Sequence, residues 1–282
     1  MTNSSKTFVI KHKARKFLYK YKSSEPYLSV SQYQRFADCC INEISQVDQL
    51  KLGSAKVLFV KSHLVEQLFQ ENYKQIIAKV IIIAGSDNSF DHIPDRLPPK
   101  VKHIFAQNSL IKVGTLVSAI PIGIEPPEQG WNGVPSLMVN KTKPQERINR
   151  ILVGPYGETN LQRVSLVDSL KKQNGPWDIY ERKMYPDLFV ELHRKYNMTL
   201  CPAGNGLDTY RIWETLYRGG LPIVDRNDWT VNMVRSGFPL QIVDFEDLQN
   251  LIAFTKKVKR FDHSNEPILY SNYWKDKINS YI

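Results

Sequence analysis

The chain has 282 residues, and its 38 lysines and arginines against 28 aspartates and glutamates give a formal net charge of +10. The apolar fraction of 42% and the charged fraction of 23% are ordinary for a globular protein, which excludes a disordered or collagen-like chain. Three cysteines (Cys39, Cys40 and Cys201) are too few for a disulfide framework, so we expect a reducing compartment. The longest apolar runs have strand length and the N-terminus lacks an apolar core, so we expect neither a transmembrane span nor a signal peptide.

The N-terminal segment is strongly basic. Residues 1–24 hold seven lysines and arginines, interleaved with aromatic residues, and the first acid is Glu25. A solvated arm, a patch that contacts an anionic membrane or ligand, and a nucleic-acid patch all agree with this pattern. The composition of the segment leaves these three interpretations open.

In the first half of the chain, short apolar runs alternate with helical stretches. The pattern predicts helices over 31–45 and 62–77, and the first of these places Cys39 and Cys40 on a helix. It predicts buried strands over 57–60, 79–84, 103–106 and 119–124. A polar stretch rich in proline and glycine, 126–148, follows and is typical of a linker.

In the second half, the alternation becomes more regular. Strands are predicted over 150–153, 177–180, 198–201, 221–224 and 240–243. Helices are predicted over 159–173, 185–196, 208–218, 245–258 and 270–281. Buried strands that alternate with helices form parallel sheets covered on both faces. We therefore predict an α/β fold of two Rossmann-like, doubly wound domains that face a cleft.

The domain boundaries follow from the linker. We place an N-terminal domain at residues 1–130, the linker at 131–148 and a C-terminal domain at 149–265. The last segment, 266–282, is predicted to be a separate C-terminal helix.

The segment from Leu200 to Val224 carries the clearest chemical signal. A strand ends at Cys201, a loop with Gly204 and Gly206 follows, and a helix begins at about Asp208. In an open α/β sheet such a loop lies at the carboxyl end of a strand, where ligands bind. Glycines let the backbone approach a ligand, and the helix N-terminus attracts a phosphate or diphosphate.

Three charged residues of this helix, Arg211, Glu214 and Arg218, share one face because they are spaced by three and four. Arg211 lies in the first turn, where its guanidinium can pair with a phosphate. The Glu214 carboxylate can accept hydrogen bonds from two adjacent ribose hydroxyls, or it can pair with both arginines in a surface cluster. The residues alone leave both roles open.

About 25 residues of this segment follow a distinctive pattern. It consists of Pro202, Gly204, Gly206, Asp208, Thr209, Arg211, Trp213, Glu214, Leu216, Gly219, Gly220, Pro222, Ile223 and Val224. The pattern resembles the donor-binding segment of exostosin-like glycosyltransferases and, more loosely, a segment of many GT-B glycosyltransferases. In the first half, Gln107, Asn108 and the run 120–124 are similar to the segment that precedes the interdomain linker of that fold.

The resemblance implies a GT-B fold of two Rossmann-like domains. The C-terminal domain would bind a nucleotide-sugar donor, the N-terminal domain the acceptor, and the final helix would cross back to the first domain. By the same resemblance, Glu214 would hold the donor ribose and Arg211 the diphosphate. Gly204, Asn205 and Gly206 would line the donor loop.

Three further residues belong to this candidate site. Asp208 and Thr209 match the family pattern without an assigned role. Arg163, in the first helix of the C-terminal domain, is also placed to meet the diphosphate; the alternative is a surface arginine without a ligand.

The sequence departs from the family pattern in two respects. The chain is short for a GT-B fold, so the N-terminal domain must be minimal. No Asp-x-Asp motif is present, so we expect no metal ion, and arginines and a helix N-terminus would neutralise the diphosphate. We expect no cofactor, because the nucleoside-diphosphate sugar is a co-substrate.

An inverting sugar transfer needs a base that takes the proton of the acceptor hydroxyl. Asp87 is the first candidate because it follows a buried strand at the carboxyl edge of the sheet. His63, which follows the preceding strand, is the second, and Asp91 and His92 are weaker candidates. An aspartate in a turn commonly has a structural role, and a retaining enzyme needs no such base.

Taken together, these features predict a glycosyltransferase that moves a sugar from a nucleoside-diphosphate sugar to a hydroxyl of a glycan or glycolipid. We expect a cytoplasmic enzyme of polysaccharide biosynthesis, held at the inner face of a membrane by its basic N-terminal arm. One alternative is a basic nucleic-acid-binding α/β protein, although no nucleic-acid-binding signature is visible and we expect no nucleic-acid partner. Another is a catalytically inactive glycosyltransferase relative.

Overall fold

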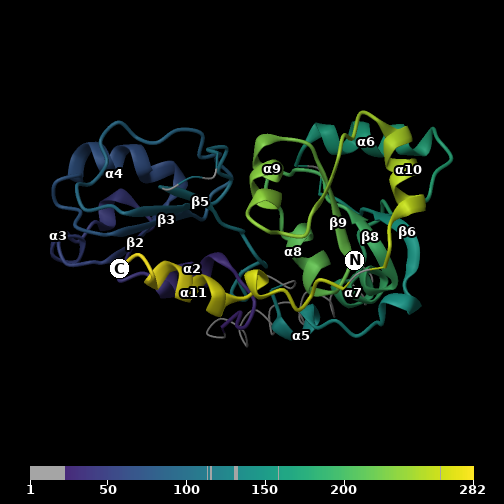
Figure 1. Ribbon diagram of the computed structural model, residues 1–282, viewed down its shortest axis with the longest axis horizontal. Coiled ribbons are helices and arrows are strands. Elements are labelled where there is room, and N and C mark those ends of the chain that lie inside the picture. The colour runs from purple at the N-terminus through teal and green to yellow at the C-terminus, as the bar shows by residue number, and fades with distance from the viewer. Residues whose placement is uncertain (1–22, 113, 115, 130–132, 158, 261) are drawn as a thin grey trace, which may run out of the picture.

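The computed structural model describes residues 23–112, 114, 116–129, 133–157, 159–260 and 262–282. Two parallel five-stranded sheets organise these residues, and they lie side by side along the long axis of the molecule (Figure 1). The prediction of an α/β fold with Rossmann-like parallel sheets is thus confirmed. Nearly all of the basic segment 1–24 lies outside the described residues, so its three interpretations stay open.

The first sheet has the strand order β1-β2-β3-β4-β5, and all its neighbours are parallel. Its strands are β1 (Cys39–Ile41), β2 (Val57–Lys61), β3 (Val80–Ala84), β4 (His103–Ala106) and β5 (Val117–Ala119). Its helices are α2 (Val30–Phe36), α3 (Gln49–Leu52) and α4 (Val65–Asn72), with 3-10 turns η1 (Ile44–Gln46) and η2 (Ser62–Leu64). The strands predicted at 57–60, 79–84 and 103–106 are confirmed.

The helix predicted over 31–45 is wrong in its second part. Helix α2 ends at Phe36, and Cys39 and Cys40 lie in strand β1, opposite residues of β2. The Asp38 carboxylate explains the break, because it accepts hydrogen bonds from the backbone N–H groups of Lys56 (2.8 Å) and Val57 (2.9 Å). This contact holds the chain in an extended conformation beside β2.

The strand predicted over 119–124 is also displaced, since β5 already ends at Ala119. Residues 120–124 are buried but leave the sheet. Pro121 has no N–H to donate to a ladder, and Gly123 has a φ of +73°, which L side chains rarely adopt. The Ile124 N–H donates instead to the Leu28 carbonyl at 2.8 Å.

The second sheet has the order β10-β9-β8-β6-β7 and is also parallel throughout. Its strands are β6 (Ile148–Val153), β7 (Trp177–Ile179), β8 (Tyr196–Leu200), β9 (Leu221–Asp225) and β10 (Gln241–Val243). Its helices are α6 (Leu161–Lys171), α7 (Pro186–Lys195), α8 (Tyr210–Tyr217), α9 (Asp228–Arg235) and α10 (Leu248–Lys257). The sequence analysis did not predict α9, which begins at a capping box formed by Asn227 and Thr230.

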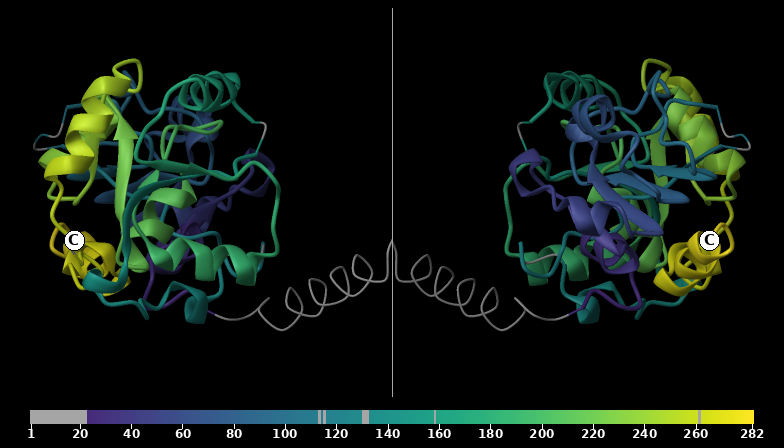
Figure 2. Two further views of the ribbon diagram at one scale, coloured as in Figure 1. Left: turned by 90° about the vertical axis from the view of Figure 1, so that its right-hand side faces the viewer. Right: turned by 90° about the vertical axis from the view of Figure 1, so that its left-hand side faces the viewer.

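Helices cover both faces of each sheet, as the end-on views also show (Figure 2). In the first sheet, α3 and α4 pack on one face, whereas α2 and the C-terminal helix α11 (Ser271–Asn279) pack on the other. In the second sheet, α6 and α10 share one face and α7 and α8 the other. The strand order of the second sheet reverses and makes that unit doubly wound, whereas the first sheet follows the chain order without a reversal, so the prediction of a doubly wound first domain is wrong.

Two segments connect the halves. The first, between β5 and β6, contains α5 (Pro135–Met138) and the 3-10 turn η3 (Pro144–Glu146). The second follows α10, passes through η4 (Pro267–Leu269) and leads into α11 against the first sheet. There Trp274 meets Phe105 edge-on at 6.2 Å, and Tyr281 stacks on His103 at 4.0 Å between ring centroids. The chain therefore returns to its first half.

Candidate functional site at the carboxyl edges of the two sheets

The second sheet has one point at which successive connections leave in opposite directions, between its neighbours β6 and β8. In open α/β sheets, ligands bind at the carboxyl ends of strands at this kind of position. The loop 154–160 follows β6, and the loop 201–209 follows β8 and leads into α8. The candidate donor residues lie on these two loops and on the helices that follow them.

Arg163 of α6 and Arg211 of α8, here called the arginine pair, both lie near the Tyr156 ring. Their guanidinium carbons are 5.6 and 5.9 Å from its centroid, and that of Arg211 is also 4.3 Å from the centroid of Phe189. The Tyr156 hydroxyl donates to the Leu200 carbonyl at 2.8 Å, which fixes the ring between the two loops. The structure thus brings Arg163 and Arg211 together.

The arginine pair contacts mostly neutral groups. Arg163 donates to the Pro202 carbonyl and to the Thr159 hydroxyl, both at 3.2 Å, and its Nε is buried without a partner. Burial and the nearby Arg211 lower the pKa of Arg163, although Tyr156 and Cys201 oppose this shift. Arg211 donates to carbonyls of the loop after β6 at 3.3 and 3.4 Å. Two guanidinium groups beside one ring favour the binding of an anion next to them.

Gly204 lies directly beside the arginine pair. A Cβ added there would be 2.9 Å from Nη2 of Arg163, so the glycine leaves room for the guanidinium. The Gly204 carbonyl accepts a hydrogen bond from Nδ2 of Asn160, the N-cap of α6, at 2.9 Å. The neighbouring Asn205 is exposed. Gly204 and the arginine pair therefore form one group, as the sequence analysis expected.

Glu214 lies deeper. Its side chain is 4% exposed, and its Oε2 is 3.7 Å from Nε of Arg211 and 3.4 Å from Nη1 of Arg218. Burial lowers the pKa of Arg218 to about 10, and the Glu214 charge acts against this shift. The pairing with both arginines that the sequence left open is present, but inside the protein and not on its surface. The role of Glu214 with a ribose stays a prediction.

Gly206 and Asp208 contact the first half of the molecule. The Asp208 carboxylate accepts hydrogen bonds from the Ile122 N–H and from Nε1 of Trp213, both at 2.6 Å. The Asp208 N–H donates to Oδ1 of Asn108 at 2.8 Å, and Nδ2 of Asn108 donates to the Asp87 carbonyl at 3.4 Å. Asn108 and Asp208, here called the clasp, join the loop of Asp87 to the loop before α8.

The clasp is tightly enclosed. Asn108 is fully buried with a φ of +50°, and a Cβ on Gly206 would lie 3.0 Å from its Nδ2. Burial raises the pKa of the Asp208 carboxyl to about 8, although the hydrogen bonds from Ile122 and Trp213 lower it. Thr209 is the N-cap of α8, but its side chain makes no capping hydrogen bond and its Oγ1 is buried without a partner.

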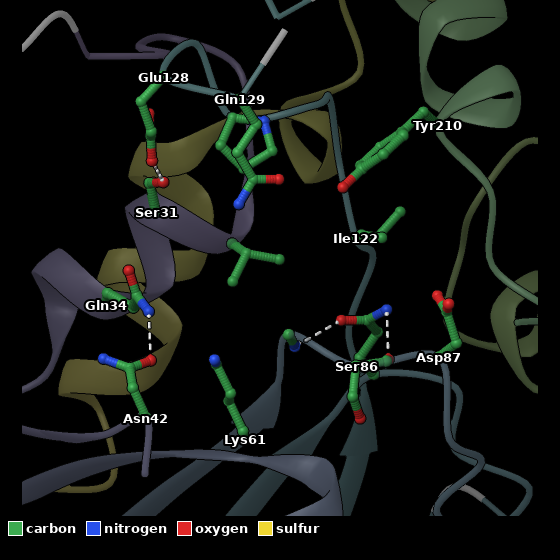
Figure 3. Close-up of a pocket in the computed structure, with 14 residues that line it drawn as sticks. Ser31, Gln34, Asn42, Lys61, Ser86, Asp87, Ile122, Glu128, Gln129 and Tyr210 are labelled. Carbon is green, nitrogen blue, oxygen red and sulfur yellow. Dashed lines mark hydrogen bonds between the residues drawn. The ribbon is translucent and has the colours of Figure 1, made fainter. Parts of the chain in front are cut away.

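A cavity of about 450 Å³ opens at the carboxyl edge of the first sheet (Figure 3). Its lining residues are Val30, Ser31, Gln34, Asn42, Lys61, Gly85, Ser86, Asp87, Gln107, Ile122, Pro126, Glu128, Gln129 and Tyr210. Tyr210 is the first residue of α8, so the second half supplies part of the wall. We call this the first-sheet cavity, and it has the size of a small-molecule site.

Of the candidate bases, Asp87 lines this cavity and His63 does not. The Asp87 side chain is exposed, and among the described residues only its backbone carbonyl accepts a hydrogen bond, from Asn108. His63 is an exposed residue of η2 outside the lining, so the structure does not bring it to the site. Asp91 and His92 pair with each other at 2.7 Å on the surface.

The sequence analysis did not select four residues that the structure adds. They are Lys61, Gln107, Tyr156 and Tyr210. Lys61 and Gln107 each follow or end a predicted strand, and that position at the sheet edge could have identified them. Tyr156 and Tyr210 stand in the loop and the helix start next to the predicted phosphate site. Aromatic residues at such positions commonly pack in the core, so the sequence did not distinguish these two as site residues.

Within the described part of the chain, every helix is too short or too polar to cross a lipid bilayer. The described ranges hold no group of three His, Cys, Asp or Glu side chains placed to bind a metal ion. No protein-family model and no curated protein matches the chain.

Proposed function

We propose that the protein is a glycosyltransferase of exostosin-like, GT-B type. It would transfer a sugar from a nucleoside-diphosphate sugar to a hydroxyl of a glycan or glycolipid, without a metal ion. The observation that carries this proposal is the arginine pair at the β6–β8 edge, next to the N-terminus of α8. The segment that holds Arg211 is the one that resembles the donor-binding segment of the family.

A diphosphate suits this position for electrostatic reasons. Guanidinium groups bind phosphate oxygens through two parallel charge-assisted hydrogen bonds. The first N–H groups of α8 add a partial positive charge, and the side chain of the N-cap Thr209 does not occupy them. As the bond between the sugar and the diphosphate breaks, these groups would stabilise the charge on the leaving diphosphate in the role that a metal ion has in other enzymes.

The acceptor would lie in the first-sheet cavity. In an inverting transfer, the Asp87 carboxylate would take the proton of the acceptor hydroxyl as that oxygen bonds to the donor sugar carbon. The clasp supports this arrangement, because it ties the Asp87 backbone to the loop before α8 through hydrogen bonds of 3.4 and 2.8 Å. The base and the donor loop would then keep a fixed separation.

Binding of a nucleotide is the direct test. We would measure thermal midpoints with UDP, GDP, CMP and ADP for the wild type, for Arg163→Gln, and for Arg235→Gln as a control on the exposed end of α9. At 100 times its dissociation constant, a bound nucleotide adds about 2.7 kcal/mol of stability, which raises the midpoint by a few degrees. We expect one nucleoside diphosphate to give this shift in the wild type and in Arg235→Gln, and a much smaller shift in Arg163→Gln.

Two outcomes would contradict the proposal. If none of the four nucleotides at millimolar concentration shifts the midpoint, the donor site is absent, and an inactive relative or a nucleic-acid-binding protein becomes the better description. If a nucleotide shifts all three proteins equally, it binds elsewhere and the arginine pair is not its site.

A further inference from the structure

Lys61 is the one cation among the fourteen residues drawn around the first-sheet cavity (Figure 3). It is the last residue of β2, so its position at the carboxyl edge follows from the strand itself. Its side chain points into the cavity, and it has no ionic or hydrogen-bond partner among the described residues. An unpaired ammonium group in a polar cavity is a ready partner for an anion.

The acidic residues of the cavity do not satisfy this charge. The Glu128 carboxylate accepts a hydrogen bond from the Ser31 hydroxyl on the far wall (Figure 3). Asp87 is at the other side of the cavity, and Lys61 takes part in none of the salt bridges found among the described residues. The cation and the two carboxylates are therefore spread around the cavity and do not neutralise one another as ion pairs.

Between these charges the lining consists of hydrogen-bonding groups. Gln34 donates to Asn42 at 2.9 Å, which leaves the Asn42 amide nitrogen free to donate. Gln107 accepts from the Gly85 N–H at 3.0 Å. The Tyr210 hydroxyl points toward the opening from the other half (Figure 3). These side-chain amides and the hydroxyl can donate and accept several hydrogen bonds, so the cavity suits a ligand with several hydroxyl groups.

We propose that the first-sheet cavity binds a sugar that carries an anionic group, a carboxylate or a phosphate, with this group on Lys61 and a hydroxyl at Asp87. The proposal rests on the proposed function, because this sugar would be the acceptor. Lys61 would be a specificity-determining residue, since a charge-assisted hydrogen bond is roughly twice as strong as a neutral one. The diphosphate of the donor would remain at the arginine pair.

The test is to measure dissociation constants by NMR chemical-shift titration for three sugars: glucuronate, glucose 6-phosphate and glucose. The proteins are the wild type, Lys61→Met and Lys56→Met. Lys56 is an exposed residue just before β2, at the opposite end of the same strand, and it does not line the cavity. It is therefore a matched control for loss of one lysine charge.

We expect glucuronate or glucose 6-phosphate to bind the wild type at least ten-fold more tightly than glucose does. Lys61→Met should abolish this preference and Lys56→Met should keep it. The anion that shows the larger preference identifies the carboxylate or the phosphate as the natural group. Equal affinity for the three sugars in the wild type, a preference that survives in Lys61→Met, or no binding of any sugar would overturn the proposal.

The same titration separates this inference from the donor site. If glucuronate or glucose 6-phosphate binds through Lys61 but no nucleotide binds, the cavity proposal stands and the glycosyltransferase proposal fails. If a nucleotide binds through Arg163 but the protein binds charged and neutral sugars equally, the glycosyltransferase proposal stands and the cavity proposal fails.

Discussion

The carboxyl edges of the two sheets are built from the same elements but differ in what the side chains do there. At the first edge, the side chains of Lys61 and Asp87 face an open cavity of about 450 Å³ and form no ion pair with each other. At the second edge, the guanidinium carbons of Arg163 and Arg211 are 5.6 and 5.9 Å from the centroid of the Tyr156 ring, and the buried Glu214 pairs with Arg211 and Arg218. One edge is open and rich in neutral hydrogen-bonding groups; the other is strongly cationic.

This difference shows how one architecture can provide two kinds of site. In both halves, five parallel strands bring loop residues to the carboxyl edge of the sheet. The fold therefore determines only where a ligand site can lie. The residues that follow each strand determine the chemistry: glycine, serine and amides at the first edge, and arginines with tyrosine and phenylalanine at the second. The first suits a sugar and the second a diphosphate.

The largest expected effect is at the second edge, where the charges are buried. Glu214→Gln should lower the free energy of unfolding by about 3–5 kcal/mol, because it leaves Arg211 and Arg218 without their carboxylate. Urea unfolding would measure the change. The matched control is Glu181→Gln, since Glu181 pairs with Lys171 at 2.7 Å while the two side chains are 61% and 39% exposed, and its loss should cost below about 1 kcal/mol. Equal costs would mean that burial does not distinguish the two pairs.

An intermediate effect is expected at the clasp, and it depends on pH. Because the Asp208 carboxyl has its pKa raised to about 8, the folded protein holds a proton that the unfolded chain releases near pH 4. The contribution of Asp208 to stability is therefore full at low pH and falls as the pH rises toward 8.

Asp208→Asn should remove this pH dependence. The variant should also lose about 1–3 kcal/mol at pH 5, because its amide N–H₂ faces the N–H donor of Ile122 or Trp213. Unfolding free energies measured at pH 5 and pH 8 should show a smaller difference between variant and wild type at pH 8. If the variant and the wild type differed by the same free energy at pH 5 and at pH 8, the raised pKa of Asp208 would be contradicted.

The smallest effects compare two glycines of one loop. In Gly206→Ala, the new Cβ meets the Asp87 carbonyl oxygen at 3.1 Å and Nδ2 of Asn108 at 3.0 Å, so we expect a loss of about 1 kcal/mol. In Gly204→Ala, the Cβ meets the mobile end of Arg163, so stability should hardly change while nucleotide binding weakens. Thermal midpoints with and without nucleotide would show whether the two effects separate in this way.

Much of the fold could be predicted from local patterns. The strand His103–Ala106 is a continuous buried run, and the structure has it with the predicted bounds. Strand β1 could not be predicted, because three residues are too short to show a period and a carboxylate contact with Lys56 and Val57 holds them in place. The spacing of Arg211, Glu214 and Arg218 gave their shared face correctly, but it could not give their burial.

The rest of the site depends on how the halves meet. Arg218 is covered because its Nε donates to the Leu137 carbonyl, a contact between residues 81 positions apart. Tyr210 reaches the first-sheet cavity because Asp208 binds Ile122, 86 positions away. Periodicity over a window of a few residues carries no information on such contacts, so the arginines could be selected from the sequence but the shared cavity could not.

The return of α11 to the first sheet has a consequence for limited proteolysis. A cut between β5 and β6 would leave α11 attached to the second half while Trp274 stays buried against Phe105, so the fragments would remain together. A cut between α10 and η4 would leave the other connection intact. A single nick should therefore give two bands on a denaturing gel but one particle in native gel filtration, because the polypeptide threads between the halves twice.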